Sequence, residues 1–131
     1  GMILVDSGKW LDGIAAMDRA IDLSKNPDLL KIQKALYLLS VYDKNRDKNN
    51  LNKAEKALLS INNENDIYYK HHLLARVYGK LGKSTSVEYH LAEMNFAIGN
   101  KERAKLHAQK ALKFKDLLSK YQKTRLKDFV E

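Results

Sequence analysis

The chain of 131 residues contains no cysteine, only one proline and only one tryptophan. The lack of cysteine excludes disulfides, thiolate zinc sites and cysteine nucleophiles. No apolar run approaches the roughly 18 residues that would cross a bilayer, so we expect no membrane insertion. Strand-like alternation of apolar and polar residues is also missing from the sequence. These absences leave helices as the expected secondary structure.

Positive charge is unevenly distributed along the chain. With 44% hydrophobic and 31% charged residues, the composition is typical of a folded protein, and the formal net charge is +8. Residues 101–131 hold ten Lys or Arg against four Asp or Glu, which accounts for +6 of that total. The pattern is typical of solvated lysines on helices, which we favour, but it also fits a basic patch for an acidic partner.

Small residues and glycines recur at a helical-repeat spacing in the second half of the chain. Gly82 and Gly99 lie 17 positions apart, half of the about 34 residues of a tetratricopeptide (TPR) repeat. The other positions that match the repeat are Leu74, Ala75, Tyr78, Leu81, Leu91, Ala92, Ala104, Ala108 and Ala111. The sequence therefore predicts an all-α fold, a TPR-like right-handed superhelix of about seven antiparallel helices, forming one domain over residues 1–131.

The remaining periodic segments predict where the helices lie. We expect Gly8 to close a turn, so that residues 9–23 are the second half of a repeat unit and the chain is a fragment that begins inside a repeat. Further helices are expected near residues 29–42, 51–61, 67–81, 84–98, 101–113 and 116–130, with polar loops at 43–50 and 62–66.

The expected first helix would lack a covering neighbour on one side. The apolar residues left open would be Trp10, Leu11, Ile14 and Met17. Because an exposed apolar patch tends to find a partner, we expect self-association through this N-terminal edge.

Three segments are more specific than a general TPR pattern: residues 73–83, 89–96 and 99–112. They resemble the C-terminal TPR domain of zinc-dependent metallopeptidases of the bacterial periplasm. The resemblance implies a periplasmic location and a role in holding client proteins or outer-membrane assembly partners for the peptidase. The His-Glu-x-x-His helix of the catalytic domain is absent, so no catalytic residue can be carried over.

The four histidines do not form a metal-binding pattern. His71 and His72 are adjacent, so on a helix they point about 100° apart, while His90 and His107 fall on different expected helices. No nucleophile elbow or glycine-rich phosphate loop is present either. We therefore expect a chain with no catalytic residues, no metal and no cofactor.

One polar stripe on the expected helix 67–81 is the candidate binding surface for a protein or peptide. Its residues, three, four and four positions apart, are Tyr69, His72, Arg76 and Lys80. Leu73, Val77 and their apolar neighbours would cover the packing side. Arg76 and Lys80 would meet carboxylates of the partner, although the same pattern is also typical of a merely solvated helix face.

Two other functions remain open. The chain could be a free-standing TPR adaptor of the cytoplasm rather than part of a peptidase. A nucleic-acid-binding role would rest on the basic C-terminal helices, with Tyr121 and Phe129 stacking on bases. We disfavour this role because the two aromatics occur at core-like spacing, which predicts burial.

Overall fold

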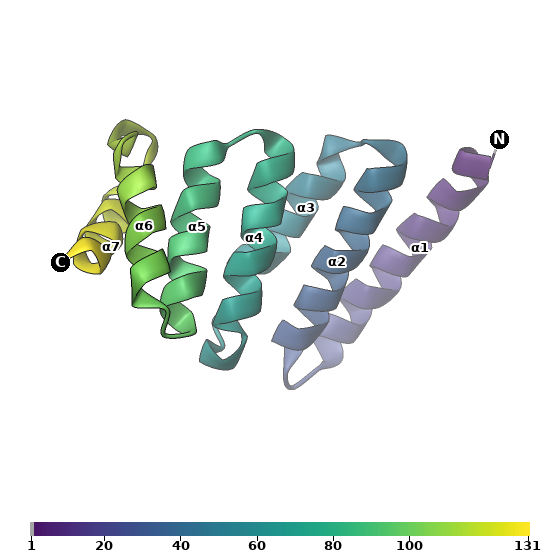
Figure 1. Ribbon diagram of the computed structural model, residues 1–131. Coiled ribbons are helices and arrows are strands. Elements are labelled where there is room, and N and C mark those ends of the chain that lie inside the picture. Colours follow the sequence, from purple (N-terminus) through teal and green to yellow (C-terminus); the bar gives the residue numbers. More distant parts are fainter. Residues whose placement is uncertain (1) are drawn as a thin grey trace. The chain divides into compact units, whose positions relative to one another are not determined.

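The computed structural model describes the backbone of residues 2–131 and the side chains of residues 9–131. Over these residues the chain forms seven α-helices, two short 3₁₀ helices and no strand (Figure 1). The elements are α1 (Met2–Leu23), α2 (Pro27–Asn45), α3 (Lys48–Leu59), η1 (Glu64–Asp66), α4 (Ile67–Leu81), α5 (Ser84–Ala97), α6 (Lys101–Leu112), η2 (Lys115–Leu117) and α7 (Lys120–Val130). The all-α prediction is confirmed. The chain divides into two compact units, residues 1–66 (unit 1) and residues 67–131 (unit 2).

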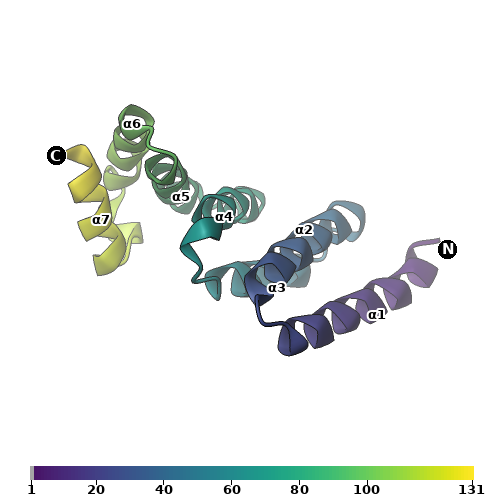
Figure 2. The same ribbon diagram turned by 90° about the horizontal axis from the view of Figure 1, so that it is seen from below.

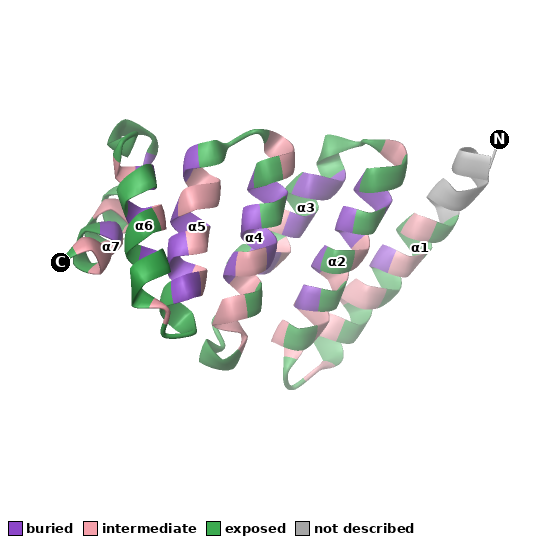
Figure 3. Ribbon diagram, viewed as in Figure 1, coloured by how far each residue is buried: buried purple, intermediate pink, exposed green. Residues whose placement is uncertain are grey.

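In unit 1, α2 packs against both α1 and α3 (Figure 2). Buried residues occur along the length of this helix (Figure 3); they are Ile32, Ala35, Leu38, Leu39, Val41 and Tyr42. The fully buried aliphatic side chains of the unit are Leu38, Leu39, Leu51, Leu58 and Ile61. Burial of such side chains stabilises a fold by about 1.5–3 kcal/mol each, so they hold α2 and α3 together, while α1 contributes the buried Ile14.

The expected turn at Gly8 is wrong, because α1 continues through this residue as one helix of 22 residues. A glycine inside a helix costs only about 1 kcal/mol relative to alanine, so a single glycine does not have to end a helix. Residues 9–23 are therefore the C-terminal part of a longer helix. Leu11 is 59% exposed as expected, but Ile14 is buried, so the predicted open edge is smaller than expected. Self-association through it stays a prediction.

The expected polar loop at residues 43–50 is also wrong. The link between α2 and α3 is only Arg46 and Asp47. Arg46 adopts a left-handed conformation (φ 57°) and its N–H donates to the carbonyl of Tyr42, which ends α2. The Asp47 side chain then accepts from the N–H of Asn49 and caps α3. The composition of the segment could not predict so short a turn, because asparagines are common both in loops and at helix ends.

Unit 2 follows the predicted spacing closely. Helix α4 has the predicted bounds, and Gly82 and Gly99 have φ values of 76° and 80° in the turns that follow α4 and α5. This left-handed conformation is strained for residues with a Cβ, which explains why glycine stands at both turns. Helix α5 packs against α4 and α6, and α7 packs against α6 and α5.

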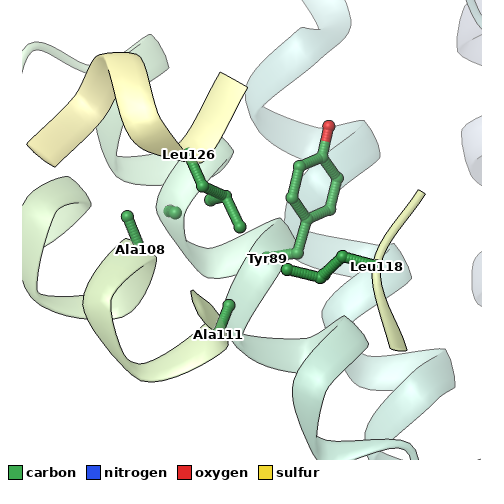
Figure 4. Close-up of a cluster of buried hydrophobic side chains, with 6 residues drawn as sticks. Tyr89, Ala108, Ala111, Leu118 and Leu126 are labelled. Carbon is green, nitrogen blue, oxygen red and sulfur yellow. The ribbon is translucent and has the colours of Figure 1, made fainter. Parts of the chain in front are cut away.

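A buried cluster joins α5, α6 and the C-terminal part of unit 2 (Figure 4). Its members are Tyr89, Ala92, Ala108, Ala111, Leu118 and Leu126. The alanines of α6 that match the repeat spacing are buried, since Ala104, Ala108 and Ala111 are at most 1% exposed. Small side chains at these positions leave room for the larger leucines of the adjacent segment.

The last helix begins later than expected, at Lys120 rather than at residue 116. Residues 115–117 form η2, and Leu118 is extended. Ser119 then starts α7 with a capping box, in which its Oγ accepts from the N–H of Gln122 and its own N–H donates to the Gln122 side chain. The Ser-x-x-Gln pattern in the sequence is the signal that should have identified this boundary.

Candidate binding surface on helix α4

Helix α4 has one buried side, which packs within unit 2. Leu74 and Val77 are fully buried, and Leu73, Ala75 and Tyr78 are buried with them. The predicted packing side is therefore confirmed. Because α4 and α5 are antiparallel neighbours joined at Gly82, this side fixes the orientation of the helix and leaves the opposite side for the polar stripe.

The predicted stripe lies on this other side of α4. Tyr69 is 54% exposed and Arg76 is exposed, whereas His72 and Lys80 are half-buried. Tyr68 extends the stripe, because its ring stacks on His72 with centroids 6.0 Å apart and meets Tyr69 edge-on at 5.4 Å. The first turns of α4 thus present three aromatic rings and its later turns present cations. Sequence reasoning missed Tyr68, which lies one position before the predicted stripe.

The adjacent histidines of α4 have different environments. His71 is buried, and its Nδ1 lies 2.9 Å from Nδ1 of His90 on α5. One ring must donate and the other accept, so both can be neutral in opposite tautomers. The His90 ring also stacks on Tyr78, with centroids 5.2 Å apart and planes 8° apart.

Burial dominates the proton affinity of this pair. Loss of water around the imidazole lowers the pKa of His71 from 6.5 to about 4, despite the opposing charge of Glu93. Burial, followed by the charges of His71 and Lys70, lowers the pKa of His90 to about 3. Both rings are therefore neutral at pH 7, and their hydrogen bond fixes α4 against α5.

A second buried group joins α5 to α7. Glu93, only 7% exposed at its side chain, accepts from the Tyr89 hydroxyl at 2.7 Å and from two nitrogens of Arg125 at 2.6 and 3.1 Å. Burial opposes ionisation of Glu93, but the hydrogen bonds from Arg125 and Tyr89 outweigh it and lower the pKa of the carboxyl. Burial raises the pKa of the Tyr89 hydroxyl, and the neighbouring Glu93 charge raises it further.

Two aromatic rings lie beside the guanidinium of this group. Arg125 lies 5.6 Å from the ring centroid of Phe96 and 5.0 Å from that of Phe129, and the two rings stack at 4.5 Å. No buried side-chain N or O atom of the described residues lacks a hydrogen-bond partner. The buried polar groups therefore hydrogen-bond to one another. These bonds fix α4 against α5 and α5 against α7, and so hold the helix that carries the exposed stripe.

Sequence reasoning did not identify this network. The sequence places His90 on a different expected helix from His71 and gives no sign of their contact, nor of the pairing between Glu93 and Arg125. The detectable signal was a charged residue inside an apolar face, since Glu93 follows buried Ala92 and lies one helical turn after Tyr89. The partner of that charge was not detectable, because Arg125 is 32 positions away.

The C-terminal aromatics do not share one environment. Tyr121 is 67% exposed, so the burial predicted for it is wrong. Phe129 is partly buried against the cluster of Figure 4. Tyr121 lies in the first turn of α7, on the side away from buried Leu126. Because the sequence predicts a helix that starts at residue 116, the apolar period of that helix places Tyr121 on the buried side.

Metal-binding and membrane-spanning features were also sought in the described part of the chain. Residues 9–131 hold no group of three or more His, Asp or Glu that could bind a metal ion. None of the helices described is long and apolar enough to span a membrane.

Comparisons with known protein families, with curated proteins and with solved structures find no match to this chain. The resemblance to the C-terminal domain of zinc metallopeptidases therefore stays a prediction from the sequence.

Proposed function

We propose that this chain is a non-catalytic protein-interaction module whose helices stack as a TPR-like right-handed superhelix. The observation that carries the proposal is the division of α4 into two sides. One side is locked by apolar packing and by the His71–His90 pair, and the other presents aromatic rings and cations. A surface held rigid from behind binds a partner at a lower entropic cost than a flexible one.

The stripe suits a protein or peptide partner that carries carboxylates. Tyr69 offers a large, rigid contact area, and Arg76 offers a planar guanidinium that can bind a carboxylate with two hydrogen bonds. Lys80 adds a point charge in the last turn, where the helix dipole favours cations. His72, held by the Tyr68 ring, lies between these two parts of the stripe.

The resemblance noted in the sequence supports a place for this module beside a zinc-dependent metallopeptidase of the bacterial periplasm. Holding a client or an outer-membrane assembly partner near a separate active site raises its effective concentration, to about millimolar for a short tether. The free-standing cytoplasmic adaptor is the alternative. The gene distinguishes them, since a His-Glu-x-x-His helix encoded upstream of Met2 supports the peptidase and its absence supports the adaptor.

A selection from a random peptide library tests the module directly. We expect enriched peptides to be acidic and to lose about tenfold or more in affinity for the double variant Arg76→Ala/Lys80→Ala. The matched control is Arg103→Ala/Lys105→Ala on α6, which removes the same charge from exposed positions and should bind normally. An equal loss of affinity in both variants would show that binding depends on net charge and not on the stripe of α4. Peptide hydrolysis by the purified chain would contradict a non-catalytic role.

A further inference from the structure

Unit 1 contains a groove that the α4 stripe does not involve. Helices α1 and α3 both pack on α2, and the space between them forms two adjoining hollows of about 630 Å³ and about 370 Å³. Ile14 of α1 and Lys53 of α3 line both hollows, so they are sections of one groove. Volumes of this size fall in the range of ligand-binding clefts.

The smaller section has an apolar wall. Ile14 and Val41 are buried at its base, Trp10 is half-buried, and Leu11 is 59% exposed beside it. A polar ligand alone would gain nothing from such a wall. An aliphatic side chain placed there would bury its surface against the indole ring and the two branched residues, at roughly 25 cal/mol per Å².

Carboxamides form the opposite wall of the same section. Asn50 is held in place, because its Nδ2 donates to the Oδ1 of Asn45 at 3.3 Å, and this oxygen also accepts from the N–H of Asp47 at 2.9 Å. Asn49 and Asn52 line the hollow and are exposed. A carboxamide carries both a donor and an acceptor, which is the pair of groups that an extended peptide backbone presents.

The larger section carries an excess of positive charge. Two of its lysines are already engaged: Lys34 pairs with Asp18 at 2.5 Å, and Lys31 lies 3.5 Å from Asp28 and donates to the carbonyl of Ser60. Lys53 and Lys56 are exposed on α3, three positions apart, and neither belongs to an ion pair of the described residues. Asp22 of α1 also lines this section, is exposed and belongs to no ion pair of the described residues. Two cations on the α3 wall and one carboxylate on α1 thus remain outside the ion pairs, which leaves the section with a positive excess.

We infer that this groove binds an extended, acidic peptide segment of another protein. Its carboxylates lie at Lys53 and Lys56, an aliphatic side chain lies against Trp10 and Ile14, and its backbone lies along the exposed asparagines. The inference rests on the proposed function, because it presumes that the chain binds proteins. It adds a second site and the chemical class of the ligand that fits it.

Trp10 is the only tryptophan of the chain, so its fluorescence reports on this groove. The probe is an acetylated synthetic peptide in which two leucines are flanked by glutamates. We expect a saturable change in Trp10 emission that weakens as the ionic strength is raised. The variant Lys53→Gln/Lys56→Gln should lose about tenfold or more in affinity, while Lys25→Gln/Lys44→Gln, with the same loss of charge in unit 1, should bind as the parent does.

The remaining outcomes separate the two proposals. The variant Arg76→Ala/Lys80→Ala should leave the Trp10 titration unchanged, so failure of the groove with intact α4 binding overturns only this inference. A peptide with glutamines in place of glutamates should bind weakly, and equal affinity for it would overturn the acidic class. A single-stranded oligonucleotide that displaces the peptide and binds more tightly would replace the peptide with nucleic acid. Circular dichroism of each variant checks that the helices are retained.

Discussion

The two units bury different chemistry although both are built from antiparallel helices. The core of unit 1 consists mainly of aliphatic side chains such as Leu38, Leu51 and Leu58. Unit 2 adds a buried network of two histidines and the Glu93–Arg125 pair to its apolar contacts. Aliphatic packing is insensitive to pH and tolerant in direction, whereas hydrogen bonds and ion pairs need particular distances and charges. Unit 2 should therefore hold its helices in a more specific register, at the cost of sensitivity to protons.

Acidification should give the largest difference in stability between the two units. The pKa values of about 4 for His71 and about 3 for His90 lie below the ordinary 6.5, so the unfolded chain takes up protons first. The contribution of the neutral pair to the free energy of unfolding is therefore present above pH 6.5 and is lost as the pH falls from 6.5 toward about 4 for His71 and about 3 for His90. From pH 7 to pH 5 we expect unit 2 to lose about 3 kcal/mol and unit 1 much less. Hydrogen exchange, corrected for intrinsic rates, measures both units in one sample.

The variant His71→Leu/His90→Leu is the control for this prediction, because it keeps α4 against α5 without titratable rings. Its unit 2 should have a flat stability profile down to about pH 5, where the lowered pKa of Glu93 still protects that carboxylate. If unit 1 lost as much stability as unit 2 on acidification, the comparison would be wrong.

Removal of Arg125 is the next largest change. In Arg125→Ala the carboxylate of Glu93, 7% exposed, loses both of its charged hydrogen bonds. An unpaired buried charge is strongly destabilising, and because the Arg125 side chain is about one-third exposed we expect a moderate loss of about 2–3 kcal/mol from unit 2. Urea unfolding followed by circular dichroism measures it. Lys127→Ala on the same helix, at an exposed position, should change stability by less than about 0.5 kcal/mol.

The capping box tests how far α7 depends on its own first turn. Ser119→Ala removes the oxygen that accepts from the N–H of Gln122 and should cost about 1 kcal/mol. Ser119→Asp keeps an acceptor at the same place and should retain the parent stability. A thermal melt that did not distinguish the two variants would show that packing at Leu126 alone holds α7.

The smallest expected effect compares one glycine from each unit. Both Gly13 and Gly79 lie inside helices. A Cβ at Gly79 would meet only Val87, at 3.9 Å, whereas one at Gly13 would lie 3.1 Å from the Tyr37 hydroxyl. Gly79→Ala should therefore stabilise unit 2 by about 0.5–1 kcal/mol, and Gly13→Ala should give unit 1 little or none of that gain. Equal gains in denaturant midpoint would show that the Tyr37 ring moves freely.

Several parts of the fold could be predicted because their causes are local. The bounds of α4 follow from its apolar period and from Gly82, which can adopt the left-handed turn without strain. The alanines of α6 recur at a helical spacing in the sequence, and the structure buries them. The errors at Gly8 and at residues 43–50 share one cause: a single glycine or a run of asparagines is compatible with both helix and loop, and packing decides between them.

By itself, the sequence determined the helical class, the turns at Gly82 and Gly99 and which side of α4 carries Tyr69 and Arg76. Only the tertiary structure decided that His71 meets His90 and that Glu93 meets Arg125, pairs separated by 19 and 32 positions. It also decided that Tyr121 is exposed, since α7 begins at Lys120 and not at the predicted boundary. Helix period and turn chemistry act within a few residues and are readable along the chain. The pairing of side chains from different helices depends on how those helices pack, and packing is a property of many residues at once.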